Sequence, residues 1–139
     1  ATLRAASSID GLLTLEMLGL FTTSVLGFGS TPAPTTVTGY IADYACWNSG
    51  FAMDTGASMT MLADEHTVHC LKMSVCVNSG YLLVTKGEMD AEYTMAADLS
   101  GHCFDDAVAI LETMDDSMTG PKVEATLAED GSCVHLKVA

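Results

Sequence analysis

The 139-residue chain is predicted to be a β-rich α+β protein, a small OB-like five-stranded barrel with two helices, preceded by an apolar N-terminal α-helix. Three observations lead to this prediction. An almost uncharged segment ends near residue 29, a Pro/Thr-rich stretch occupies residues 30–36, and short β-rich runs then alternate with two helical patterns. Five short strands with a helix before the last hairpin are typical of a partly open OB barrel. We therefore expect three parts, with the globular head at residues 37–139.

The N-terminal arm, residues 1–29, carries one charge between residues 11 and 28, at Glu16. Its apolar residues surround the helix axis, and a helix that is apolar on all sides must be buried. Eighteen residues would span about 27 Å, which is marginal for a bilayer. The arm is therefore either a core helix of the same domain or a docking segment for a membrane or another subunit. The residues expected to mediate assembly are Leu12, Leu15, Glu16, Leu18, Phe21 and Val25.

The linker at residues 30–36, "STPAPTT", is short and stiff because its prolines favour extended backbone. The head then begins with the β-rich run 36–46 and a loop at 48–58. A helix is predicted from about residue 59 to 77, with Ser58 as its N-cap.

The second half of the head is predicted to contain two hairpins with a helix between them. The runs 80–86 and 91–97 flank a turn, and a helix capped by Ser100 begins near His102. The runs 122–128 and 133–138 surround "EDGS", which is a strong hairpin signal.

The composition limits the function. The net charge of -13 would repel a phosphate backbone, so we expect no nucleic-acid partner. Five cysteines favour an oxidising compartment, although a reducing compartment with metal-held thiolates is the alternative. Two disulfides among five cysteines allow fifteen arrangements, and the spacing alone does not choose among them.

The stretch "HTVHCLKMSVC", residues 66–76, is the densest cluster of potential ligands. On one continuous helix, His66, His69, Cys70 and Met73 would share a face, and such ligands favour copper over magnesium or calcium. The same pattern fits a disulfide-anchored helix, which we prefer, or a plain core stripe. No second cysteine pair at ribbon spacing supports zinc, and the haem motif Cys-x-x-Cys-His is absent.

Residues 37–138 resemble a group of small, uncharacterised bacterial secreted domains with a cysteine-bearing helix, a Gly-Tyr strand and a closing hairpin. The matching positions are Gly39, Ile41, Asp43, Cys46, Cys70, Cys76, Gly80 and Tyr81. The resemblance implies an OB-like barrel outside the cytoplasm and implies no activity. We expect its three cysteines, together with Cys103, to supply two disulfides, which leaves Cys133 as the odd thiol.

The stretch "GLLTLEML", residues 11–18, resembles the processing site of type IV pilins and pseudopilins. In those proteins a glycine precedes an apolar helix with glutamate at its fifth residue, and Gly11 and Glu16 have that spacing. The resemblance implies a filament built from packed N-terminal helices.

From these observations we predict a non-catalytic, extracytoplasmic structural or assembly subunit, located in a secreted, cell-surface, periplasmic or organelle-lumen compartment. Its arm would pack with identical copies or into a membrane protein complex. The alternative is a soft-metal binder or carrier that uses His66, His69, Cys70 and Met73. No phosphate loop or nucleophile elbow indicates an enzyme, and we expect no cofactor.

Overall fold

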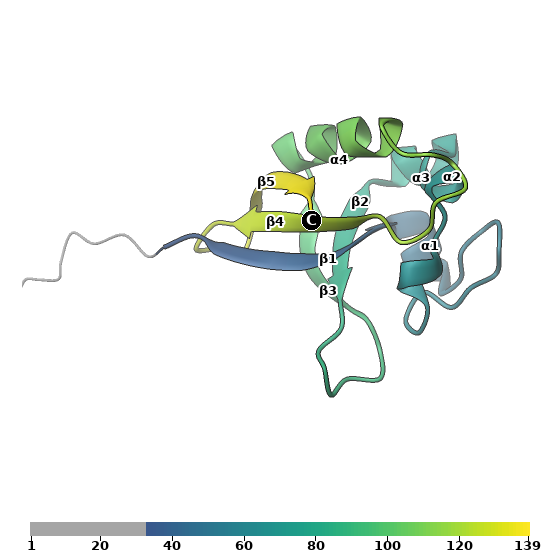
Figure 1. Cartoon of the computed structure of the whole chain (residues 1–139), viewed down its shortest axis with the longest axis horizontal. Helices are drawn as coiled ribbons and strands as arrows, with labels where there is room; N and C mark the ends of the chain where they lie inside the picture. The colour runs from purple at the N-terminus through teal and green to yellow at the C-terminus, as the bar shows by residue number, and fades with distance from the viewer. Residues whose placement is uncertain (1–32) are drawn as a thin grey trace, which may run out of the picture. The chain divides into compact units, whose positions relative to one another are not determined.

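The computed structural model describes residues 33–139, of which Pro34–Ala139 form one compact unit (Figure 1). The predicted apolar helix, its six assembly residues and the first three residues of the linker, 30–32, lie outside the described residues. None of the helices from residue 33 onward is both long and apolar enough to cross a membrane.

A five-stranded antiparallel sheet forms the centre of the unit, in the order β3-β2-β1-β4-β5. The strands are β1 (Thr35–Asp43), β2 (Tyr81–Thr85), β3 (Thr94–Leu99), β4 (Lys122–Leu127) and β5 (Cys133–Val138). The prediction of a β-rich α+β fold with five strands is confirmed. The strands β3 and β5 lie at the two ends of this order, and no pairing closes them into a barrel within residues 33–139.

The closing hairpin β4–β5 has nearly the bounds that its alternation predicts, because Val123, Ala125 and Leu127 point inward. The strand β1 begins at Thr35, so residues 35 and 36 belong to the sheet and not to the linker. Their partners are Leu127 and Thr126 of β4.

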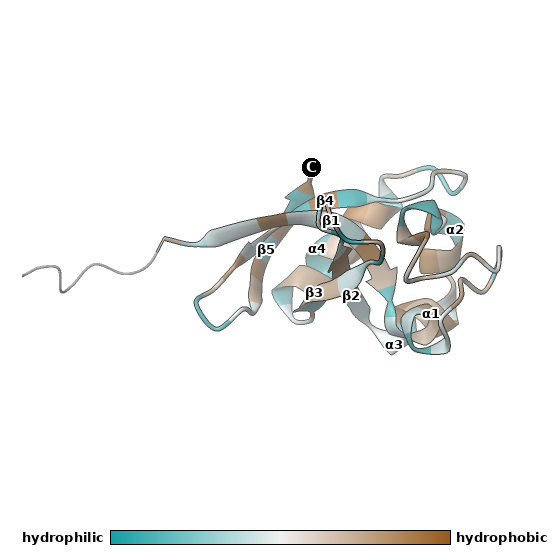
Figure 2. Cartoon of the chain, turned by 90° about the horizontal axis from the view of Figure 1, so that it is seen from below, coloured by the Kyte–Doolittle hydropathy of each residue, from teal (hydrophilic) through white to brown (hydrophobic). Residues whose placement is uncertain are grey.

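The helix α4 (His102–Glu112) lies against β5 and covers one face of the sheet (Figure 1). Its buried residues Cys103, Ala107 and Leu111 join the larger core cluster, and Figure 2 shows the apolar segments that line this layer. The predicted cap at Ser100 is wrong. Gly101 occupies the N-cap with a φ of 58°, and no side chain caps the helix.

Three short helices and a 3₁₀ turn gather at one end of the sheet (Figure 1). They are α1 (Tyr44–Ser49), η1 (Ala63–Glu65), α2 (Val68–Leu71) and α3 (Ser74–Ser79). They surround the smaller core cluster, which includes Met59 and Leu82. The short elements η1, α2 and α3 occupy the segment for which one long helix, residues 59–77, was predicted.

That long helix is wrong because the backbone turns extended at two residues. His66 has a ψ of 124° and Met73 has a ψ of 141°. Between them the Thr67 hydroxyl accepts a hydrogen bond from the Cys70 amide at 2.9 Å and so starts a new helix. The apolar residues therefore keep a helical spacing in the sequence, although the backbone of this segment is helical only in short pieces.

The disulfide Cys103–Cys133 joins α4 to β5, while Cys46, Cys70 and Cys76 are free. The prediction that Cys133 is the odd cysteine is therefore wrong, as is the expectation that the three free cysteines are bridged. The reason is tertiary, because α4 packs on β5 and brings two cysteines 30 residues apart to a Cα separation of 6.1 Å. One disulfide is consistent with an oxidising, extracytoplasmic environment.

A glycine turn after α4 supports the segment that contains His66. The Gly120 amide donates a hydrogen bond to the His66 carbonyl at 2.9 Å, and Gly120 has a φ of +58°. A Cβ at this position would collide with the Asp64 backbone, whereas a Cβ at Gly101, with the same φ, would meet nothing within 4 Å.

We expect Gly120→Ala to destabilise the protein by about 1 to 2 kcal/mol more than Gly101→Ala. Both substitutions strain the backbone, but only the first pushes on the η1 backbone beside His66. Chemical denaturation of the two variants measures the difference. Equal losses of unfolding free energy in the two variants would show that the close approach of Gly120 to the Asp64 backbone does not affect stability.

Candidate metal centre

His66 is fully buried, at 0 % exposure, and neither ring nitrogen makes a hydrogen bond, although Nε2 lies 3.3 Å from Asp43 Oδ1. Asp43 and His66 are the only buried polar or charged residues within residues 33–139. A buried polar group without a partner costs about 1 to 3 kcal/mol, and such groups are rare in native proteins. The His66 ring therefore requires an explanation beyond packing.

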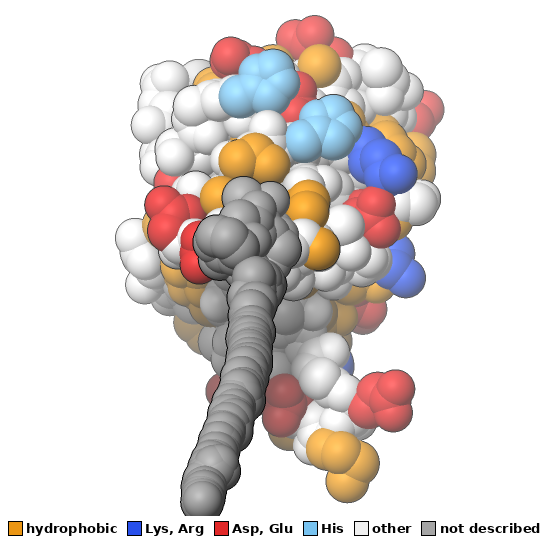
Figure 3. Space-filling view, turned by 90° about the vertical axis from the view of Figure 1, so that its left-hand side faces the viewer, with side chains coloured by type: hydrophobic (Ala, Val, Ile, Leu, Met, Phe, Trp, Pro, Cys, Tyr) orange, Lys and Arg blue, Asp and Glu red, His pale blue; other side chains and the backbone are white. Residues whose placement is uncertain are grey.

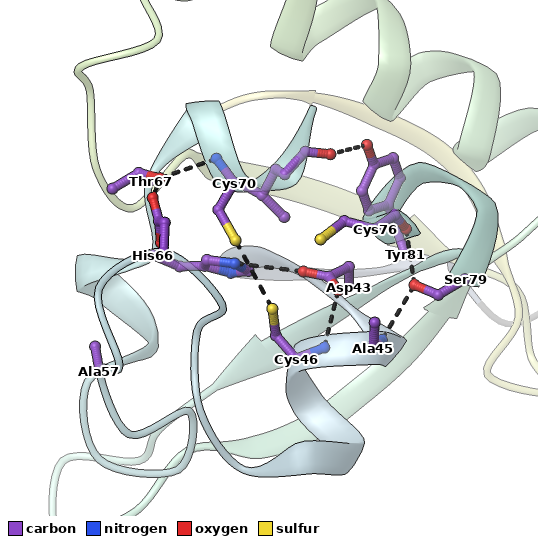
Figure 4. Close-up of polar contacts among 12 residues, drawn as sticks. Asp43, Ala45, Cys46, Ala57, His66, Thr67, Cys70, Cys76, Ser79 and Tyr81 are labelled. Atoms are coloured by element: carbon purple, nitrogen blue, oxygen red, sulfur yellow. Dashed lines mark hydrogen bonds and ion pairs between the residues drawn. The ribbon is translucent and has the colours of Figure 1, made fainter. Parts of the chain in front are cut away.

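Three free thiols come from three different helices, two of them beside this ring and the third beside Asp43 (Figure 4). Cys46 lies in α1, Cys70 in α2 and Cys76 in α3, and each is 0 % exposed. Short capped helices fix two of them. The Asp43 carboxylate caps α1 through the Cys46 amide, and Thr67 caps α2 through the Cys70 amide.

The distances suit a tetrahedral metal ion. The Sγ atoms of Cys46 and Cys70 lie 3.8 Å apart, and zinc–sulfur bonds of about 2.3 Å place two ligand sulfurs of a tetrahedron about 3.8 Å apart. One ligand atom each from Cys46, His66 and Cys70 lie within 4.8 Å of one another. A second, overlapping set joins Cys46 to Cys76 and Asp43 within the same limit.

Asp43 connects the two sets. Its Oδ2 accepts the Cys46 amide at 2.9 Å, and its Oδ1 lies 3.3 Å from His66 Nε2 (Figure 4). Metal-bound histidines commonly direct their second ring nitrogen toward a carboxylate, which sets the tautomer and the ring orientation. Asp43 is placed to do this for His66.

The protonation states leave the centre without a positive charge. Burial lowers the pKa of His66, although Asp43 and Asp54 oppose this effect, so the ring is neutral near pH 7. Burial also raises the pKa of the Cys46 thiol to about 12, with Asp43 and Cys70 raising it further. Burial, followed by the nearby Asp43, likewise raises the pKa of Cys76.

The raised thiol pKa values apply to a centre without a cation. A bound cation would reverse them, because a coordinating thiol loses its proton. The neutral imidazole of His66 is already the form that binds metal. Without a metal, the only basic side chain among residues 33–139 that lies close to the fully buried Asp43 is the neutral His66 ring. A metal ion would supply the missing positive charge. The donor set therefore fits a soft or borderline ion.

The structure brings only part of the predicted copper set together. His66 and Cys70 lie in the centre, but His69 is exposed and Met73 is half-buried beside the smaller core cluster. The correction follows from the broken helix, since His66 lies before α2 and reaches inward from a separate backbone segment.

Sequence reasoning did not identify Cys46, Cys76 or Asp43 as members of a metal centre. Their signal was present in two places, the Asp-x-x-Cys run at residues 43–46 and the His-x₃-Cys-x₅-Cys run at residues 66–76. Nothing in the spacing showed that the two runs meet, because 19 residues separate Cys46 from His66. No family model, curated protein or solved structure matches the chain.

Proposed function

We propose that residues 34–139 form a non-catalytic, extracytoplasmic zinc-binding domain of OB type. Cys46, His66, Cys70 and Cys76 would hold one Zn²⁺, with Asp43 orienting the His66 ring. The observation that carries this proposal is the fully buried His66, whose ring nitrogens make no hydrogen bond while the free thiols of Cys46 and Cys70 lie beside it.

The fourth ligand is assigned to Cys76 on chemical grounds. Asp43 already uses Oδ2 to cap α1 and directs Oδ1 at His66, whereas Cys76 is a free, buried thiol that lies beside Cys46 and Asp43. A Cys₃His set is typical of closed, structural zinc sites, in which the protein fills every position. Such an ion stabilises a fold and does not turn over a substrate.

Zinc is favoured over copper by the donor types, because thiolates combined with imidazole are typical of tetrahedral zinc sites. The Cys46–Cys70 distance of 3.8 Å matches one edge of a tetrahedral zinc site, and the exposed His69 has no place in this set. Zinc would also protect the thiols. In a compartment that forms the Cys103–Cys133 bond, two adjacent free thiols would otherwise be open to oxidation.

Cys46, His66 and Asp43 are also the residue types of a catalytic nucleophile, its base and an acid that orients the base. Two observations favour metal binding over such catalysis. The three side chains are fully buried, and the pKa of the Cys46 thiol is raised, whereas reactive cysteines have lowered values and are partly exposed.

Strand connectivity supports the OB part of the proposal. The strands β1, β2 and β3 form a meander, α4 follows, and β1 also pairs with β4 of the closing hairpin. This is the strand plan from which the OB-like head was predicted. Assembly through the N-terminal arm stays a separate prediction that concerns residues outside the described part of the chain.

We expect the purified protein to contain about one zinc per chain, and His66→Ala to lose it. His69→Ala is the matched control, because His69 is an exposed histidine three residues away. Elemental analysis of anaerobically purified protein measures the metal, and X-ray absorption should give zinc–sulfur distances of about 2.3 Å and a zinc–nitrogen distance of about 2.0 Å.

Two outcomes would contradict the proposal. One is a Cys46–Cys70 disulfide without bound metal, detected by alkylation of native, non-reduced protein. The other is equal metal loss from His66→Ala and His69→Ala. One copper ion in place of zinc, retained in competition with zinc, would keep the centre but change the assigned ion.

A further inference from the structure

A second group of metal-ligand side chains lies on the surface, where α4 meets β5. His102 and Asp106 are one turn apart on α4, and His135 lies on β5. His102 Nε2 is 3.6 Å from Asp106 Oδ1, and His135 Nδ1 is 3.4 Å from Asp106 Oδ2. Figure 3 shows two histidine side chains close together beside acidic groups on one face of the molecule.

A disulfide and a backbone hydrogen bond connect the helix and the strand that carry these three side chains. Cys103, adjacent to His102, is bonded to Cys133, two residues before His135. The Leu136 amide donates a hydrogen bond to Asp106 Oδ2 at 3.0 Å. The helix and the strand are therefore joined covalently beside the cluster, which limits the entropy that ordering the ligands would cost.

The chemistry and accessibility of the cluster suit a borderline divalent ion. Two imidazoles and one carboxylate are a ligand set that zinc uses when one position stays open. Zinc–nitrogen bonds of about 2.0 Å place neighbouring ligand atoms about 3.3 Å apart, and His102 Nε2 lies 3.6 Å from Asp106 Oδ1. One ligand atom from each of the three residues lies within 4.8 Å of the others. The histidine side chains are 70 % and 56 % exposed, so an ion can reach them from solvent.

We propose that His102, Asp106 and His135 form a second, exposed Zn²⁺ site, independent of the buried centre. The Oδ1 atom of Asp106 is the available carboxylate ligand, because Oδ2 is occupied by the Leu136 amide. Three protein ligands leave one tetrahedral position free. Water fills that position in the isolated protein, and a ligand atom of another molecule can replace it.

The test titrates full-length, zinc-purified protein with ZnCl₂ by calorimetry in a buffer that does not chelate metals. We expect one further zinc per chain above the ion already present. His135→Ala and Asp106→Asn should each weaken this binding about tenfold or more, and the control His69→Ala should leave it unchanged. Imidazole ¹⁵N resonances of His102 and His135 should shift on addition of zinc, while those of His69 stay in place.

The proposal is overturned if wild-type protein takes up no further zinc, or if His69→Ala weakens the added binding as much as His135→Ala does. Either result would reduce the cluster to two histidines that pair with Asp106. The outcome is separate from that of the buried centre, because only added zinc whose binding is weakened in His135→Ala and Asp106→Asn is assigned to the surface cluster. Circular dichroism checks that the exposed substitutions leave the fold intact.

Discussion

Removal of zinc from the buried centre should lower the free energy of unfolding by about 4 kcal/mol or more. Binding to the folded state alone stabilises by about 4 kcal/mol when the free ion is 1,000-fold above its dissociation constant, and structural zinc sites reach larger values. Without the ion, the buried His66 and Asp43 again lack partners for three polar atoms. Denaturation of anaerobic protein with and without chelator measures the change.

The loss should be concentrated at one end of the sheet. The helices α1, α2 and α3 carry the three thiols and are only four to six residues long, so little local helical stability holds them. Hydrogen exchange of the stripped protein should therefore increase in these helices before it increases in α4, β4 and β5.

Added zinc should restore the original exchange pattern, and magnesium should not, because hard ions do not favour thiolates. Uniform loss of protection throughout residues 34–139, or no change on chelation, would contradict a metal that holds this end together. Cys70→Ser should behave as the stripped protein does, even when zinc is present.

Loss of the disulfide should have the second largest effect. Replacement of both Cys103 and Cys133 by alanine is expected to lower the free energy of unfolding by about 3 to 4 kcal/mol, because the bond closes a loop across a sequence separation of 30. Chemical denaturation without reductant measures the difference from wild type.

The control is the response to reductant. A reductant that leaves zinc bound should destabilise wild type by a similar amount and leave the double variant unchanged. The variant should also retain the zinc of the buried centre, because all of its ligands lie between β1 and β2 in the chain and none lies on α4 or β5. Wild-type stability in the double variant would show that packing of α4 on β5 alone fixes this contact.

The strands were predictable because each carries its own signal. In β4, Val123, Ala125 and Leu127 alternate with partly or fully exposed residues, and the polar turn that follows can only reverse the chain, so local pattern and tertiary structure agree. The stripe of α4 was predictable for the same reason, since Ala107 and Leu111 face the core.

The region between β1 and β2 was less predictable, because its helical pattern is interrupted by side-chain capping. Thr67 starts a new helix with its own hydroxyl, and the residue before it, His66, has an extended backbone and a buried side chain. Periodicity cannot reveal this, since it assumes one continuous axis. The predicted ligand face therefore included His69, which the actual backbone turns to solvent.

The sequence by itself determined the strand pattern, the acidic charge and the concentration of cysteine and histidine in the head, because these depend on residue type and local spacing. Only the tertiary structure decided which cysteines meet. Packing of α4 on β5 joins Cys103 to Cys133, while α3, which contacts both α1 and α2, lies where Cys46 meets Cys76 and also Cys70 and His66. Cysteine pairing and metal coordination depend on distances of a few ångströms between segments far apart in the chain, and long-range packing sets those distances.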